Sequence, residues 1–210
     1  MNMEWFTIIR SLGIWLDGQV SWLKSKEWNV SLQQGKGTES PVLNAYHRFW
    51  HIQVTIVKDL SSSWELSELT FIVKNGTKKS QHVRVIVKKE QYVTEGIPVS
   101  MVSRTKQSIV TYERDRVTLL STSFFQDHRY QLAVGNEKSI WNETLGVLTL
   151  SPIWRGEHLR MAVINIDLEG YAERIGRIWY ITGHCEEELY IRHMEKWMEQ
   201  HDTPSKQQLS

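Results

Sequence analysis

The sequence contains one cysteine, Cys185, and four prolines in 210 residues. A single cysteine cannot form an intramolecular disulfide, which excludes a small secreted fold held together by disulfides. The chain also lacks a long uninterrupted apolar run. Arg10 and Asp17 interrupt the apolar N-terminal stretch, and no basic segment precedes it, so neither a signal peptide nor a membrane span is expected. We therefore expect a cytoplasmic protein.

The sequence also lacks a large excess of charge of one sign, and it lacks the common catalytic motifs. The formal net charge is +1, which argues against a globally electropositive protein, and sequence-specific binding of nucleic acid is not expected. The sequence has no phosphate-binding loop, dinucleotide fingerprint, H-E-x-x-H, G-x-S-x-G or paired C-x-x-C motif, so no cofactor and no metal site is predicted. A non-enzymatic role is favoured. A hydrolase with an unrecognised site stays open, because catalytic triads assemble from residues that are distant in sequence.

Tryptophan, by contrast, is abundant. The chain has ten tryptophans, and each can bury a large apolar area, so a few core positions can give a substantial core. Exposed tryptophans on a β-sandwich can also stack on sugars. Trp141 and Trp154 flank turns and are the candidates for such exposure, whereas most of the others lie on apolar faces.

Alternation of apolar and polar residues predicts an antiparallel β domain over residues 46–182. Ile52, Val54 and Ile56 alternate with polar residues, and similar segments with turn signals recur about every ten residues, as in a β-sandwich or a partly closed barrel. Asn75-Gly76 predicts a hairpin that joins the strands before and after it. Residues 31–45 read as a polar loop. The segment 174–183 is apolar on both faces, which predicts a central strand or one beneath a helix.

Helices are predicted at both ends of the β domain. Apolar residues recur at spacings of three and four over residues 3–25, which predicts an amphipathic helix within 1–28. Peripheral membrane contact through 3–25 is the less favoured interpretation, because the polar face is not strongly basic. A second helix is predicted over 184–201, with Tyr190, Met194 and Trp197 as its buried stripe, and residues 202–210 read as a flexible tail.

The clearest charged feature is basic. The region 74–106 holds eight basic and two acidic residues and is a candidate site for an anionic surface or a partner protein. The alternative is an exposed hairpin whose lysines prevent edge-to-edge aggregation. The candidate anion- or partner-binding residues are Lys74, Lys78, Lys79, His82, Arg84, Lys88 and Lys89.

The second charged feature is acidic and lies in GHCEEELYIRHMEKW, residues 183–197. Glu186, Glu187 and Glu188 fall in the first turn of the predicted helix, where the helix dipole favours negative charge. The order of charges therefore indicates a helix start rather than a reactive thiol or a metal site at Cys185. These three glutamates are the candidate partner-facing residues of an acidic helix.

Three functions follow as hypotheses. The favoured one is a protein-interaction or assembly module, which could self-associate if the basic region of one copy meets the acidic helix of another. The two charged regions could equally meet within one molecule. The alternative is a small-molecule or lipid carrier with a cavity inside a β-barrel. The third is the hydrolase already named.

Overall fold

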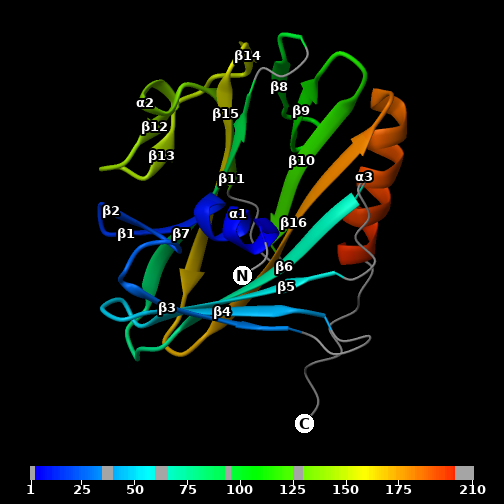
Figure 1. Cartoon of the computed structure of the whole chain (residues 1–210). Helices are drawn as coiled ribbons and strands as arrows, with labels where there is room; N and C mark the ends of the chain where they lie inside the picture. The colour runs from blue at the N-terminus through cyan, green and yellow to red at the C-terminus, as the bar shows by residue number, and fades with distance from the viewer. Residues whose placement is uncertain (1–2, 35–39, 60–65, 93–95, 125–129, 202–210) are drawn as a thin grey trace.

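Two antiparallel β-sheets face each other in the computed structural model of the chain, which describes residues 3–34, 40–59, 66–92, 96–124 and 130–201 (Figure 1). The fold is mostly β with one helix at each end, as the sequence predicts, and the arrangement is a sandwich.

The smaller sheet has five strands in the order β11-β15-β7-β1-β2. Their bounds are β1 (Leu12–Leu16), β2 (Gln19–Trp22), β7 (Gln81–Gln91), β11 (Tyr130–Gly135) and β15 (His158–Leu168). The long central pair β7 and β15 supplies most of the inner face of this sheet.

The larger sheet has nine strands in the order β14-β8-β9-β10-β16-β6-β5-β4-β3. Their bounds are β3 (Trp28–Gln33), β4 (Val42–His47), β5 (Ile52–Lys58), β6 (Leu66–Asn75), β8 (Val99–Ser103), β9 (Ser108–Tyr112), β10 (Val117–Phe124), β14 (Ile153–Arg155) and β16 (Glu173–Gly183). The expected central strand is confirmed, because β16 lies between β10 and β6 and also beneath the C-terminal helix.

Three apolar clusters hold these layers together. The largest lies between the sheets and includes Val83, Val85 and Val87, which alternate along the inner face of β7. A second covers the outer face of the five-stranded sheet beneath α2 (Glu137–Ile140) and the short pair β12 (Trp141–Asn142) and β13 (Val147–Leu148). The third lies between the nine-stranded sheet and α3 (Glu186–His201).

The N-terminal helix is much shorter than predicted. α1 (Met3–Ser11) ends where β1 begins, and a hairpin follows it, so the β domain starts at Leu12 and not at residue 46. Asp17 and Gly18 form the two-residue turn of this hairpin, both with positive φ, and Asp-Gly is a strong hairpin signal. β1 is buried along its whole length, so its apolar residues satisfy a helical spacing without forming a helix.

The hairpin predicted at Asn75-Gly76 is wrong. β6 pairs with β5 and β16 in the larger sheet, whereas β7 pairs with β1 and β15 in the smaller one, so the chain crosses between sheets at this point. The buried Asn75 amide donates hydrogen bonds to the carbonyl oxygens of Lys79, Leu168 and Glu169. Asn75 therefore fixes a crossover instead of a two-residue turn.

Two other predictions need correction. Much of the polar loop predicted over residues 31–45 belongs to β3 and β4, which pair with each other. The predicted C-terminal helix is confirmed as α3. Met194, which was predicted to be buried, is 48% exposed, and the neighbouring His193 is buried instead. The predicted tail, 202–210, lies outside the described residues.

Candidate functional site

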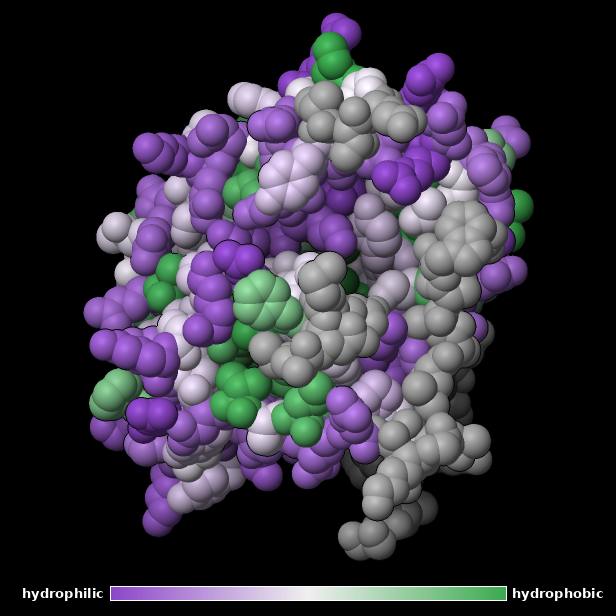
Figure 2. Space-filling view, viewed as in Figure 1, coloured by the Kyte–Doolittle hydropathy of each residue, from purple (hydrophilic) through white to green (hydrophobic). Residues whose placement is uncertain are grey.

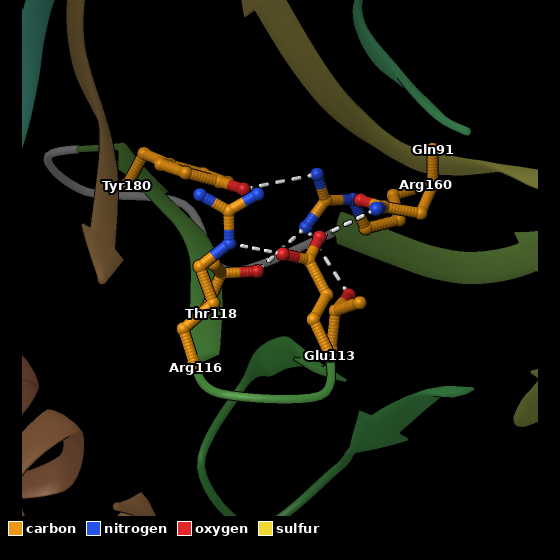
Figure 3. A network of polar contacts seen from close by, with 7 residues as sticks. Gln91, Glu113, Arg116, Thr118, Arg160 and Tyr180 are labelled. Carbon is orange, nitrogen blue, oxygen red and sulfur yellow. Dashed lines mark hydrogen bonds and ion pairs between the residues drawn. The ribbon is translucent and has the colours of Figure 1, made fainter. Parts of the chain in front are cut away.

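The inner layer of the sandwich is polar at one end. Along β15, Arg160 is in phase with Ala162 and Ile164, so its side chain enters the space between the sheets. It is only 1% exposed. On the facing sheet, Tyr180 of β16 and Thr118 of β10 point into the same space (Figure 3). A charged residue therefore lies inside a largely apolar core.

Arg160 is held by hydroxyl groups. Its Nη1 donates to Thr111 Oγ1 at 3.1 Å and to Thr118 Oγ1 at 3.0 Å, and its Nη2 donates to Tyr180 Oη at 3.1 Å (Figure 3). Its Nε has no hydrogen-bond partner. These partners come from β9, β10 and β16, so the guanidinium crosslinks the two sheets at this end of the sandwich.

A second cation, Lys89, lies beside the same phenol. Its Nζ is 5.0 Å from the centre of the Tyr180 ring, and Lys89 is paired directly opposite Arg160 in the β7–β15 ladder. Burial alone would raise the pKa of the Tyr180 phenol. Arg160, the Thr118 hydroxyl and Lys89 together outweigh burial and lower that pKa below its ordinary value.

A carboxylate and a histidine border this cluster. Glu113 accepts from Gln91 Nε2 at 2.5 Å and is paired with Arg116 (Figure 3). His158 Nε2 lies 2.5 Å from Ser100 Oγ, a pair that could suggest the nucleophile and base of a hydrolase. Ser100 is fully buried, however, and the Nδ1 atom of His158 faces the backbone carbonyl of Gly156, so no carboxylate from the described residues orients the ring.

An apolar cavity adjoins the polar cluster. Its volume is about 310 Å³, and Thr7, Ile8 and Ser11 of α1 form part of its wall. Its apolar walls come from both sheets, and its polar lining includes Tyr180 and Lys89. The apolar lining residues are Ile8, Leu12, Leu69, Val87, Leu120 and Ile178.

A second hollow, of about 520 Å³, adjoins the first along α1 and shares Thr7, Ser11, Lys88 and Lys89 with it. This face of the molecule is mostly hydrophilic, with apolar side chains gathered near its centre (Figure 2). The two hollows are therefore neighbours that share part of their walls.

The seven predicted basic residues do not form one surface. Lys74 ends a strand of the larger sheet, and Lys78 and Lys79 lie in the crossover. His82, Arg84 and Lys88 share the outer face of β7, whereas Lys89 points inward.

The outward-facing members already have partners. His82 Nδ1 lies 2.6 Å from Asp167 Oδ1, and Lys88 pairs with Glu137 at 3.2 Å. Arg84 stacks on Trp15 and donates to the carbonyl of Leu145. Of the predicted set, Lys88 and Lys89 border the cavity, but only Lys89 directs its ammonium between the sheets, because the strand pleat turns Lys88 outward.

The acidic residues of α3 are partly used within the molecule. Glu186 accepts from Tyr112 Oη at 2.5 Å and pairs with Lys106 at 3.7 Å, so the acidic and basic regions touch within one chain. Glu188 pairs with Arg192 at 2.9 Å, and Glu187 is exposed. Cys185 is exposed, and among the residues described no group of three or more His, Cys, Asp and Glu could hold a metal ion.

The tryptophans are largely structural. Trp5, Trp15, Trp28 and Trp179 are buried. Trp141 and Trp154, the candidates for sugar stacking, are each half-buried against an apolar cluster, and Trp141 also lines a surface hollow of about 660 Å³. In the described part of the chain, no helix is both long and apolar enough to cross a membrane.

No family model and no curated protein matches this sequence. Among solved structures, a bacterial glucoamylase complexed with acarbose superposes with a TM-score of 0.63 at 12% identity, over 91% of this chain and 29% of that one. A heparinase III gives a TM-score of 0.51 at 12% identity, over 83% of this chain and 24% of that one. The chain thus spans less than a third of either protein, and at this identity the likeness shows the fold.

Proposed function

We propose that this chain is a non-enzymatic binding domain whose cavity between the sheets holds a small molecule with an apolar body. The observation that carries the proposal is the cavity of about 310 Å³ beneath α1. Its volume, its apolar walls and its few convergent polar groups are typical of small-molecule sites. The proposal keeps the carrier hypothesis but moves the ligand from the inside of a barrel to the space between two sheets.

A neutral fluorescent probe, N-phenyl-1-naphthylamine, tests this proposal by titration at a fixed protein concentration. We expect one probe per chain, with emission shifted to the blue because the ring leaves water. Leu69→Trp fills the cavity from β6 and should abolish binding. Leu150→Trp makes the same change at a side chain that is 60% exposed and should bind as the wild type does. Equal binding by both variants, or none by the wild type, contradicts the proposal.

The second candidate is the protein-interaction or assembly module. α3 presents an apolar stripe to the outside, since Ile191, Met194 and Met198 are 63%, 48% and 51% exposed at helical spacing. Glu195 and Glu199 flank this stripe. An exposed apolar stripe with a charged border is a feature of interaction surfaces. A protein partner or a second copy could cover it, while Glu186 already serves an internal contact.

Sedimentation velocity at several concentrations, in low and in high salt, tests self-association through this stripe. We expect a mass that rises with concentration in the wild type and stays monomeric in Met194→Lys. A mass that is independent of concentration and salt would remove self-association. A cytoplasmic location remains part of the proposal, supported by the single cysteine.

A further inference from the structure

We infer that the ligand of this cavity is an amphipathic anion, whose carboxylate or sulfonate group lies against Lys89 and Tyr180 with Arg160 behind them. The inference rests on the proposed function, because it names the chemical class of the molecule that the cavity would hold. The shared chemistry is a small oxyanion head on an apolar body.

The first argument is the charge of Arg160. It is 1% exposed, and no carboxylate forms an ion pair with it among the described residues. Glu113, the carboxylate of the same network, is engaged by Gln91 and Arg116. A buried cation without a counter-charge carries a desolvation penalty that hydroxyl partners offset only in part.

Two other partly buried cations, Arg177 and Lys196, share a buried carboxylate. Arg177 pairs with Glu68 at 3.3 Å, and Lys196 pairs with the same carboxylate at 3.1 Å. Glu68 is only 4% exposed, so an internal acid supplies the counter-charge there. A buried carboxylate thus neutralises Arg177 and Lys196, whereas no carboxylate of the described residues forms an ion pair with Arg160.

The second argument is the position of Lys89. It lies directly opposite Arg160 in the β7–β15 ladder, and both side chains point between the sheets. Like charges at directly opposed positions destabilise a sheet, and the Tyr180 ring, whose centre is 5.0 Å from Lys89 Nζ and 5.2 Å from the guanidinium carbon of Arg160, compensates only part of this cost. An anion beside Tyr180 Oη would compensate both cations at once.

The third argument is the positive charge of the hollow that adjoins the cavity. The adjoining hollow along α1 is lined by Arg10, Lys24, Lys89 and Lys88, the last of which pairs with Glu137, and Glu90 is its one acidic side chain among the described residues. Lys89, whose side chain points between the sheets, also lines the inner cavity. Clefts lined by one sign of charge raise the local concentration of the opposite ion. The adjoining hollow thus favours an anion, as the cavity between the sheets does.

A matched pair of probes tests this inference. 8-Anilino-1-naphthalenesulfonate carries the ring system of N-phenyl-1-naphthylamine plus a sulfonate, so the ratio of their two affinities isolates the anionic group. Lys89→Met should lower the preference for the sulfonate by about 10-fold, the value of one charge-assisted contact. Tyr180→Phe should lower it in the same direction, and Lys89→Arg should preserve it.

Lys79→Met is the control, because it removes the same charge from the exposed crossover at the other end of β7. It should keep the wild-type ratio. If the wild type binds both probes equally and Lys89→Met changes nothing, the anion inference is overturned while the small-molecule proposal stands. If neither probe binds, or Leu69→Trp binds both as the wild type does, the cavity proposal fails and the inference fails with it.

Discussion

The indole nitrogen of Trp179 donates a hydrogen bond to Nδ1 of His193 across 3.0 Å, in the layer between β16 and α3. The other ring nitrogen of His193, Nε2, lies 2.9 Å from the carbonyl oxygen of Lys106. Since an indole only donates and a carbonyl only accepts, the geometry requires a neutral His193 with its proton on Nε2. One side chain thus joins α3 to the central strand and to the β8–β9 turn.

His193→Leu should lower the free energy of unfolding by about 1–3 kcal/mol, because it leaves the Trp179 indole and the Lys106 carbonyl buried without partners. Urea denaturation followed by tryptophan fluorescence measures this loss. Met194→Leu, at the exposed neighbouring position, should leave the midpoint unchanged. Equal midpoints for the two variants would mean that the hydrogen bonds contribute nothing to docking of the helix.

Stability should fall as the pH drops below about 6.5. Burial lowers the pKa of His47, His158 and His193 below the ordinary value of 6.5. Below that pH the unfolded chain takes up protons that the folded chain does not, so the free energy of unfolding decreases. Urea denaturation at pH 7.5, 6.5 and 5.5 measures the slope.

The histidine account has its own control. His193→Asn removes one titrating group and should give a shallower slope than the wild type over the same interval. His184→Asn changes an exposed histidine just before α3 and should retain the wild-type slope. Stability that is constant from pH 7.5 to 5.5 would contradict the assignment of these histidines as neutral in the folded state.

Arg160→Met should unfold at the same urea concentration as the wild type or at a higher one. A buried cation without a carboxylate is often replaced by an apolar residue of similar length at no cost. The freed hydroxyl of Thr111 keeps its contact with Ser100 at 2.6 Å. The variant should also lose the preference for the sulfonate probe. A loss of stability above about 3 kcal/mol would instead assign Arg160 a structural role.

Asn75→Asp should lower the free energy of unfolding by at least about 3 kcal/mol, because a carboxylate would face three carbonyl oxygens in a buried site. Chemical denaturation provides the measurement. Asn142→Asp is the matched control, because Asn142 is exposed and its side chain only accepts a hydrogen bond from the backbone of Leu145. Similar stabilities for the two variants would show that Asn75 does not fix the crossover.

Local alternation predicted much of the sandwich. The period of two located β5 and β15, and the apolar faces of β16 indicated its central place beneath α3. The N-terminal hairpin was not predicted, because the apolar residues of the fully buried strand β1 also fit a helical spacing. The Asp17-Gly18 turn signal was present in the sequence, and it predicts the observed hairpin better than the apolar spacing does. The crossover at Asn75 was not predicted, because the sheet to which β6 or β7 belongs depends on partner strands that are distant in sequence.

The candidate site was only partly predictable. Arg160 has a local signal, since it is a charged residue in phase with the inward apolar residues of β15. Its hydroxyl partners, Thr111, Thr118 and Tyr180, come from three other strands, and no local pattern brings them together. Lys89 was predicted as one of a basic group, but the pleat of β7 separates it from the outward-facing members.

The most direct test of the account is a crystal structure of the protein grown with 8-anilino-1-naphthalenesulfonate. The account predicts one probe between β7 and β16 beneath α1, with its rings against Leu69 and Val87 and its sulfonate within hydrogen-bond distance of Lys89 and Tyr180. A probe bound only elsewhere, such as on the outer stripe of α3, would contradict it.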